Sequence, residues 1–420
     1  MTTHEPTTRV LVSGGGIAGL ALALQLVRHG IATTVVERAA APRPGGQAVD
    51  LRGASRTVAE RMGLMPGIAG HRLHEEGMTY VDGRGRVFGR MSMEAFDGKG
   101  AVAEIEIARG DLSDVLLTEL TALSDMAPGL LDLRFGDRIT ALTQDADGVD
   151  AIFERHEPER YDVVVGADGV HSATRRLVFG PEEHFATGLG GYAAFFTMPT
   201  PADIEPGWFT MRFVPGATFG IRPDHDPATA KAMLTLRVDS DPRLRGDRRR
   251  QEALIRSLLR DAGWRAPEIL DAMAAASDFY FDELLRIDMP SVVAGRVALL
   301  GDAGSCGSPM TGMGTATALI GAYLLAERIA GAGQDAAGTG VVDALRQYDA
   351  DIAPFIEAGK KIPGGGIARM VPANRFEAAM SRAMTGVMLS RPLRPLVRRM
   401  FADSAAELSL PVGDPAPVAG

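Results

Sequence analysis

Two patterns of hydrophobic residues alternate along the chain, and they predict different kinds of sheet. Unbroken apolar runs of strand length lie within residues 8–16, 32–38, 161–166 and 295–300. Such runs are typical of strands buried on both faces of a parallel sheet. Helical spacing follows the first run, over residues 17–30, so the chain opens with a strand, a helix and a second strand. Another helix is predicted at 109–123, with one apolar side formed by Leu112, Leu116, Leu117 and Leu120.

The pattern changes between residues 188 and 239. Short strand-like stretches separated by turn residues occur there, at 191–198, 207–214, 217–223 and 232–239. They indicate an antiparallel sheet, and a further strand is predicted at 279–289. Because the first pattern returns at residue 295, the antiparallel sheet is expected to be inserted into the first domain. The predicted fold is α/β: a Rossmann-like nucleotide-binding domain, an inserted antiparallel β-sheet domain and a C-terminal helical segment.

The last segment, residues 367–408, carries five methionines among arginines, at 370, 380, 384, 388 and 400. We expect a helix that packs across both domains, because methionine fills irregular gaps in cores. A methionine-rich surface for a partner or a membrane is the alternative.

Composition narrows the class of protein. The chain has 420 residues, a net charge of −9 and no basic stripe, which argues against nucleic acid as a partner. A single cysteine excludes an internal disulfide and, with no signal-like start, favours a cytoplasmic location. The charge-free stretch 303–326 is apolar over too short a length to span a membrane. His71 and His74 have metal-like spacing without further ligands, so no metal site is expected.

A glycine motif follows the first predicted strand. Gly14, Gly16 and Gly19 form G-x-G-x-x-G, which permits a tight turn, close approach to a pyrophosphate and close helix packing. Glu37 ends the second strand, 23 positions after Gly14, at the spacing of the acid that binds a ribose. A carboxylate there repels a 2′-phosphate, which favours the AMP half of FAD or NAD over NADP. A turn chosen for packing alone is the alternative.

Two more motifs follow buried strands. "GADGVHSATRR" spans residues 166–176, and "GDAGSCGSPMTGMGTA" spans residues 301–316. With the first motif they resemble, in the same order, the motifs of the class A flavoprotein monooxygenases, which have the para-hydroxybenzoate hydroxylase fold. The chain is most similar to the branch that inactivates tetracyclines or hydroxylates aromatic polyketides. It departs from the family at Ser305, where histidine is common, and at Ala316, Ala318 and Gly321.

This resemblance implies a division of the chain. The FAD-binding domain would comprise residues 1–80, 106–186 and 289–360. Residues 81–105 and 187–288 would form the substrate domain, and residues 361–420 a C-terminal helix and tail.

The resemblance also implies roles for single residues. Asp302 would bond the ribityl or ribose part of FAD, and backbone N–H groups at Gly312–Thr315 would approach the flavin ring. Arg109 would reach the ribityl-pyrophosphate region, with a surface helix arginine as the alternative. Asp168 would serve FAD and nicotinamide binding, with a helix-capping turn as the alternative. The complete set expected to bind FAD is Gly14, Gly16, Ala18, Gly19, Glu37, Arg38, Asp50, Arg109, Asp168, Asp302, Gly312, Met313, Gly314 and Thr315.

For the other ligands, the resemblance makes Arg43 the candidate for the phosphate of NADH or NADPH. Apolar and aromatic strands suggest a substrate site, with Arg212, Phe219 and Arg222 as candidate contacts. Which face each strand side chain takes is left open, because a strand alternates its side chains between two faces.

The function implied is a single-component monooxygenase. NAD(P)H would reduce the flavin, and one atom of O₂ would pass through a flavin C4a-hydroperoxide into a small aromatic or polyketide-like substrate. No catalytic side chain is then needed, since the cofactor performs the chemistry. A flavin-dependent reductase or dehydrogenase and a non-catalytic flavin-sequestering protein are the alternatives. The protein is expected to be a monomer or a homodimer.

Overall fold

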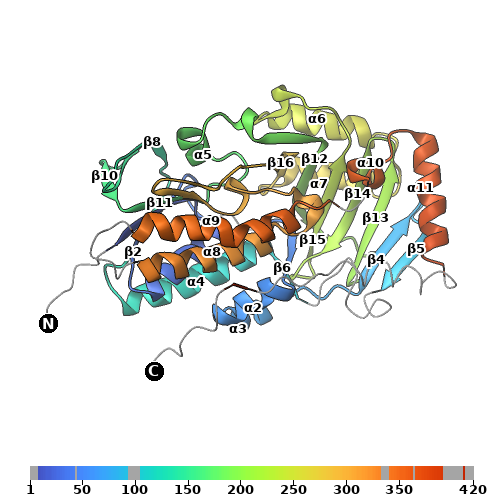
Figure 1. Cartoon of the computed structure of the whole chain (residues 1–420). Coiled ribbons are helices and arrows are strands. Elements are labelled where there is room, and N and C mark those ends of the chain that lie inside the picture. Colours follow the sequence, from blue (N-terminus) through green and yellow to red (C-terminus); the bar gives the residue numbers. More distant parts are fainter. Residues whose placement is uncertain are drawn as a thin grey trace.

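The computed structural model describes residues 8–42, 45–92, 105–332, 340–362, 365–390 and 410–411. Two bodies lie side by side, each built around its own large sheet (Figure 1). A six-stranded sheet with long helices forms one body, and a seven-stranded sheet forms the other. The α/β class predicted from the sequence is confirmed.

The six-stranded sheet has the order β17-β18-β11-β1-β2-β7. Its pairs are parallel except the edge pair β17–β18. The strands are β1 (Arg9–Ser13), β2 (Ala32–Glu37), β7 (Leu131–Phe135), β11 (Val163–Gly166), β17 (Val293–Ala294) and β18 (Val297–Leu299). Side chains alternate between its faces: Val10 and Val12 join the core beneath the helices, and Leu11 joins the core on the other face.

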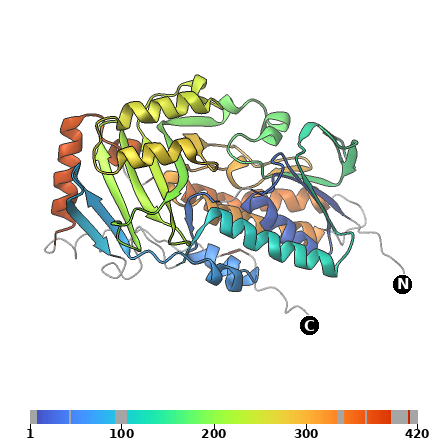
Figure 2. The ribbon, with the colours of Figure 1, turned by 180° about the vertical axis from the view of Figure 1, so that it is seen from behind.

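Helices cover one face of this sheet, and a small antiparallel sheet covers the other. Figure 2 shows the helical layer from behind. It contains α1 (Ile17–Arg28), α2 (Gly53–Arg61), α3 (Met65–Gly70), α4 (Arg109–Met126), α8 (Gly314–Ala332) and α9 (Gly340–Gly359). The small sheet contains β8 (Ile139–Gln144), β9 (Val149–Phe153) and β10 (Glu159–Tyr161). As predicted, the apolar stretch at 303–326 ends in a buried helix, since α8 is buried over most of its length.

The seven-stranded sheet has the order β16-β12-β15-β14-β13-β4-β5. Its strands are β4 (Gly77–Val81), β5 (Val87–Ser92), β12 (Ala186–Pro199), β13 (Trp208–Val214), β14 (Ala217–Pro223), β15 (Thr229–Leu236) and β16 (Tyr280–Ile287). The strands predicted between residues 188 and 289 pair antiparallel, as expected, whereas β4 joins them by a parallel pair with β13. β4 also crosses the boundary expected between residues 80 and 81. The face of the seven-stranded sheet that points away from the six-stranded body is covered by α6 (Arg248–Leu259) and α7 (Ala266–Ala275).

A two-stranded ribbon, β3 (Ala48–Asp50) and β6 (Glu106–Ala108), lies where the two bodies meet. α5 (Ala173–Val178) and the one-turn 3₁₀ helices at Glu182–His184, Gly301–Ala303 and Pro309–Thr311 complete that region. Of the predicted site residues, Asp50 lies in β3 and Asp302 in the 3₁₀ helix at Gly301–Ala303.

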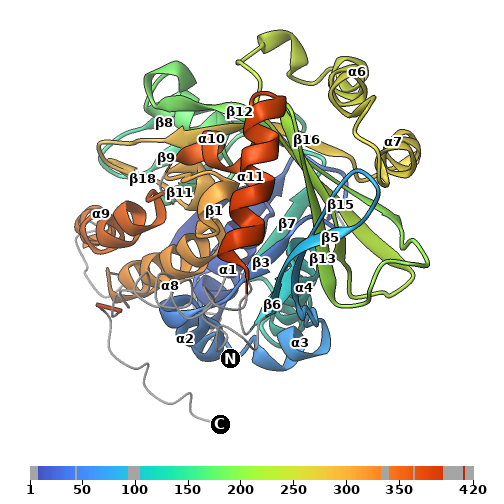
Figure 3. The same cartoon turned by 90° about the vertical axis from the view of Figure 1, so that its right-hand side faces the viewer.

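The C-terminal helices are α10 (Gly366–Met370) and α11 (Arg375–Met388). α11 stands against the β5 and β13 end of the seven-stranded sheet (Figure 3). The expectation that its methionines fill a core between the domains is not met. Met380 and Met384 are 45% and 55% exposed, and only Met388 packs, against Met91.

Candidate functional site

Three loops meet at one edge of the six-stranded sheet. Gly14 follows β1, Asp168 follows β11 and Gly301 follows β18, and these three strands are neighbours in the sheet. Because neighbouring parallel strands end at the same edge, segments far apart in the sequence become adjacent there. A Cβ on Gly301 would lie 3.0 Å from the Cβ of Ala18, so the first and third motifs are in contact.

The first glycine loop has the geometry of a pyrophosphate cradle. Gly14 has φ +114°, and a side chain on it would clash with the Ala167 carbonyl. Gly19 packs directly on the Gly14 carbonyl, so neither position tolerates a Cβ. A Cβ on Gly16, by contrast, would meet nothing within 4 Å, and the helix begins there without a side-chain cap. Free N–H groups therefore face open space at a helix N-terminus, which fits an anion.

Glu37 lies beside this loop. Its carboxylate accepts hydrogen bonds from the N–H of Gly15 at 2.9 Å and of Ala39 at 2.8 Å. These bonds orient the carboxylate at the end of β2, the position expected for the acid that binds a ribose. Arg38, the next residue, is exposed.

The loop between Gly301 and Thr315 forms a second cradle. Gly312 has φ +66°, and a Cβ there would meet nothing within 4 Å. Residues 312–314 are exposed, and α8 begins at Gly314 with no acidic residue in its first turn. A Cβ on Gly314 would lie 3.5 Å from Oδ1 of Asp302. The helix end and the carboxylate therefore flank the same space.

Two charged groups act on each other across this space. Burial raises the pKa of Asp302, and the positive charge of Arg109 opposes that rise. Arg109 is the first residue of α4, and its Cβ would be 3.3 Å from a Cβ on Gly46. The start of α4 is held to the loop at Gly45 and Gly46, because the N–H of Gly110 donates to the Gly45 carbonyl at 2.7 Å. Arg109 is exposed, and its charge nevertheless acts on Asp302 beside the second cradle.

The second motif serves mainly to hold other parts of the site. Asp168 accepts from the Ser172 hydroxyl and from the N–H and hydroxyl of Thr174, at 2.9 and 3.1 Å. These bonds match the helix-capping alternative for Asp168, because both of its oxygens are used within its own loop. Arg175 is fully buried and donates to the Ala303 carbonyl at 2.9 Å, which ties the second motif to the third.

Arg222 lies in a buried cluster that the sequence did not reveal. Its guanidinium donates to Glu75, and it donates to Glu106 at 3.1 Å. Both carboxylates are buried, and Asp50 lies opposite Glu106 in the β3–β6 ribbon. Burial raises the pKa of Glu106 to about 8, Arg222 opposes this rise, and the nearby Glu75 and Asp50 charges add to it. Burial and the neighbouring negative charges thus favour the protonated form of Glu106. No sequence signal connects these residues, which come from four different segments.

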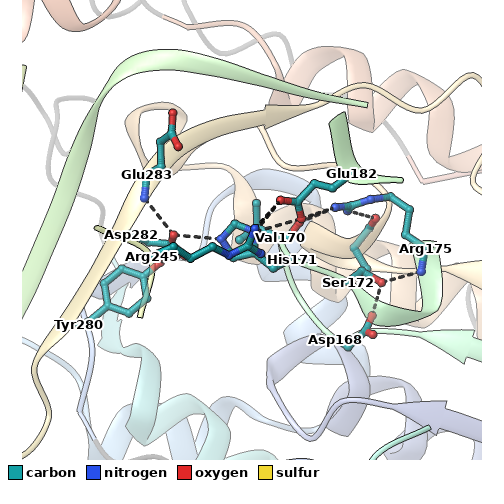
Figure 4. A network of polar contacts seen from close by, with 11 residues as sticks. Asp168, Val170, His171, Ser172, Arg175, Glu182, Arg245, Tyr280, Asp282 and Glu283 are labelled. Carbon is teal, nitrogen blue, oxygen red and sulfur yellow. Dashed lines mark hydrogen bonds and ion pairs between the residues drawn. The ribbon is translucent and has the colours of Figure 1, made fainter. Parts of the chain in front are cut away.

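A second polar cluster surrounds His171, which occupies a variable position of the second motif. Its ring contacts Glu182 and Asp282, which come from different segments of the chain (Figure 4). The sequence reasoning did not single out any of these three residues.

The strand pairing decides which faces the substrate candidates take. Arg212 pairs with Phe219, so both point to the face covered by α6 and α7. There Arg212 donates to the Ala262 carbonyl at 2.6 Å, and Phe219 is fully buried against Trp264. Core packing accounts for both, which argues against their expected substrate contacts. Arg222 points to the opposite face, over Phe209.

That opposite face is turned towards the second cradle. Phe195 and Met233 lie on it and pack with Met310, a residue of the 301–316 loop. The ring of Tyr280 stacks on Phe195, with 5.7 Å between ring centroids. An apolar and aromatic surface thus lies next to the loop expected to hold the flavin.

Three predictions concern features outside this geometry. Arg43 lies outside the described residues. Within the part of the chain that the structure describes, no group of three or more His, Cys, Asp or Glu side chains is arranged to hold a metal ion. Among the same residues, no helix is long and apolar enough to cross a lipid bilayer.

The fold and the paired glycine cradles define a dinucleotide-binding flavoprotein, and comparison with known proteins agrees. The family model of the FAD binding domain matches residues 7–360. A flavin-dependent monooxygenase of Legionella longbeachae is 33% identical, over 84% of this chain and 87% of its own length. An uncharacterized protein of Mycobacterium tuberculosis is 39% identical, over 88% and 96%. The crystal structure of the tetracycline destructase Tet(55) is similar with a TM-score of 0.77 and 29% identity, over 98% of this chain and all of that one.

The chain therefore belongs to the FAD-binding-domain family, as a class A flavin-dependent monooxygenase. The resemblance inferred from the three sequence motifs is confirmed. These relatives favour a monooxygenase over both the reductase and the sequestering protein.

Proposed function

We propose that this enzyme uses NADH or NADPH as its reductant and transfers one oxygen atom of O₂ to a small, apolar, aromatic or polyketide-like molecule. The observation that carries the proposal is the position of the second cradle. It lies between a pyrophosphate cradle on one side and an aromatic face of the seven-stranded sheet on the other. A cofactor extended across the sheet edge would thus meet a substrate at its far end.

The residues present fit FAD. The loop at Gly14–Gly19 would hold the pyrophosphate, and Glu37 the ribose of the AMP half. Asp302 and Arg109 would hold the ribityl part, and the backbone at Gly312–Thr315 would lie against the flavin ring. When bound, FAD supplies the redox chemistry, accepting electrons from the nicotinamide and activating O₂.

The protein's own part is electrostatic and steric. The N-terminus of α8 presents N–H groups and the positive end of a helix dipole to the space beside Asp302. Such a fixed dipole stabilises negative charge on a bound ring without a basic side chain. Phe195, Met233 and Phe209 keep water away from the substrate side.

The substrate class follows from the same face. Its side chains are aromatic or apolar, and Arg222 already donates to two carboxylates. A flat, largely uncharged molecule fits this face better than an anion that needs a free arginine. The similarity to tetracycline destructases supports a polycyclic, polyketide-like substrate.

Replacing Asp302 tests the cofactor assignment. We expect Asp302→Ala to weaken FAD binding by about ten- to a hundredfold, the cost of losing a hydrogen bond to a charged group. Asp343→Ala is the matched control, since Asp343 is 65% exposed on α9 and pairs only with Arg346 among the contacts the structure describes. Flavin retention after gel filtration and fluorescence titration with FAD provide the measurement. Equal affinity in Asp302→Ala and the control would refute the assignment.

Oxygen transfer is tested separately. Candidate polyketides are incubated with enzyme, NADH or NADPH, and isotopically labelled O₂. We expect one labelled oxygen atom in the product. Consumption of reductant with label only in hydrogen peroxide or water, across a broad substrate panel, would contradict the proposed function.

A further inference from the structure

The imidazole ring of His171 lies between two carboxylates from different parts of the molecule. Its Nδ1 is 3.0 Å from both oxygens of Glu182, and its Nε2 is 3.0 Å from Oδ1 of Asp282 (Figure 4). Glu182 follows α5 in the six-stranded body, whereas Asp282 belongs to β16 of the seven-stranded sheet. The ring is therefore a direct side-chain bridge between the two bodies.

This bridge requires a charged ring. A neutral imidazole has one N–H, so it can donate to one carboxylate only, whereas an imidazolium donates from both nitrogens. The hydrogen bonds to Asp282 and Glu182 raise the pKa of His171 to about 9. The side chains of His171, Glu182 and Asp282 are 22%, 22% and 23% exposed, so solvent screens these bonds only partly.

The other charges around the ring are consistent with this state. Arg175 and Arg245 both contact Glu182, at 3.1 and 3.3 Å. Burial alone would raise the pKa of Glu182, but His171 and these two arginines lower it overall. On the other side, the Tyr280 hydroxyl lies 3.3 Å from Asp282. Asp168 lies in the same loop and is occupied by Ser172 and Thr174. These contacts favour the ionised form of Glu182, which accepts from the ring.

The bridge ends at residues that face the proposed cofactor. On one side, Glu182 accepts from Arg175, which also holds the Ala303 carbonyl next to Asp302. On the other, Asp282 lies two residues after Tyr280, whose hydroxyl feels the charges of Arg109 and Asp302. β16 is an edge strand, paired only with β12 within its sheet, so few other bonds fix its outer side. Besides the bridge, the Ser240 hydroxyl donates to Glu283 at 3.1 Å, and at the far end of β16 the Ile287 N–H donates to the Cys306 carbonyl at 2.9 Å.

We propose that protonated His171 is a positioning residue, which fixes the edge strand β16, and with it Tyr280, against the loops that hold the flavin. Loss of the proton on His171 releases one of its two carboxylates and lets β16 separate from these loops. The effect of this movement on oxygen transfer rests on the function proposed above. The bridge itself does not, and it can be tested without a substrate.

Hydrogen–deuterium exchange of the FAD-loaded enzyme tests the bridge. We expect amides of β16 to lose at least tenfold protection in wild type between pH 7.5 and 10, after correction for the intrinsic exchange rate. In His171→Gln, which cannot carry the charge, protection should be low at both pH values. His156→Gln is the matched control, because His156 pairs with Asp137 on a different part of the surface. It should follow wild type.

Two further measurements keep the test decisive. Asp282→Asn retains a side chain that accepts a hydrogen bond but removes the negative charge. It should reproduce the His171→Gln result, and it provides the same test if His171→Gln folds poorly. Where a substrate is available, the fraction of NAD(P)H converted to product should fall above pH 9 in wild type and be independent of pH in His171→Gln. Equal protection of β16 in wild type and both variants at pH 7.5 would overturn the proposal. An enzyme that never oxidises NAD(P)H would instead refute the proposed function and leave the exchange result standing.

Discussion

Two polar junctions connect the two bodies of this flavoprotein, and they differ in which group can lose a proton. At the first junction, Arg222 of β14 forms ion pairs with Glu75 and Glu106. The side chains of Arg222, Glu75 and Glu106 are 12%, 1% and 2% exposed, respectively. At the second, His171 meets Glu182 and Asp282, which remain partly exposed. An arginine does not deprotonate in a protein, so only the carboxylates of the first junction titrate. At the second junction, the cation itself titrates.

The difference decides which group makes each junction depend on pH: a carboxyl group at the first and the bridging cation at the second. Around Arg222, two buried carboxylates share one guanidinium, and burial with the neighbouring negative charges favours a proton on Glu106. Around His171, one proton on the ring maintains both bonds. Both junctions lose stability as the pH rises, since both groups have a higher pKa in the folded state than in the unfolded chain. The windows differ: from 4.5 to about 8 for Glu106, and from 6.5 to about 9 for His171.

The largest effect is expected at the first junction. Arg222→Met should lower the free energy of unfolding by about 3–5 kcal/mol, because it leaves buried carboxylates without a cation. Urea unfolding monitored by circular dichroism measures the loss. Adding Glu75→Gln should restore part of it, since Oε2 of Glu75 already has no hydrogen-bond partner among the described residues. A loss below 1 kcal/mol in Arg222→Met would mean that this junction contributes little to the connection.

An intermediate effect is expected at the second junction. Wild type should be more stable than His171→Gln by about 1–3 kcal/mol below pH 6.5, from 1.36 kcal/mol per pKa unit reduced by solvent screening. This advantage should disappear as the pH rises through 9, because the bridging charge is then lost. Unfolding curves from pH 6 to pH 10 provide the measurement, with His156→Gln as the control. A stability difference independent of pH would show that packing, not charge, is responsible.

The smallest effect near neutral pH is expected for Glu106→Gln. Glutamine resembles the protonated carboxyl group, so the free energy of unfolding should change by no more than about 1 kcal/mol below pH 7. Above pH 8 the variant should keep stability that wild type loses, because wild type must ionise a buried carboxyl group there. Unfolding at pH 5, 7 and 9 separates the two proteins. Parallel stability profiles would contradict the buried proton.

The sequence alone determined the parts of the site that depend on local geometry. Gly14 and Gly19 admit no side chain, and Glu37 ends the strand beside them, so spacing was sufficient to place them. The apolar runs also placed the parallel strands, since those strands are buried on both faces. The cofactor class followed from these motifs because a phosphate cradle is made of backbone, which the glycine positions encode directly.

Only the tertiary structure decided what depends on register and on contacts between distant segments. Pairing of β13 with β14 placed Arg212 on the same face as Phe219 and away from Arg222, a choice that alternation within one strand leaves open. The parallel pair of β13 with β4 joins segments more than a hundred residues apart. The same holds for His171, since its two carboxylates lie 11 and 111 positions away along the chain. Local sequence patterns do not predict contacts over such separations, so the proton-dependent bridge is visible only in the folded chain.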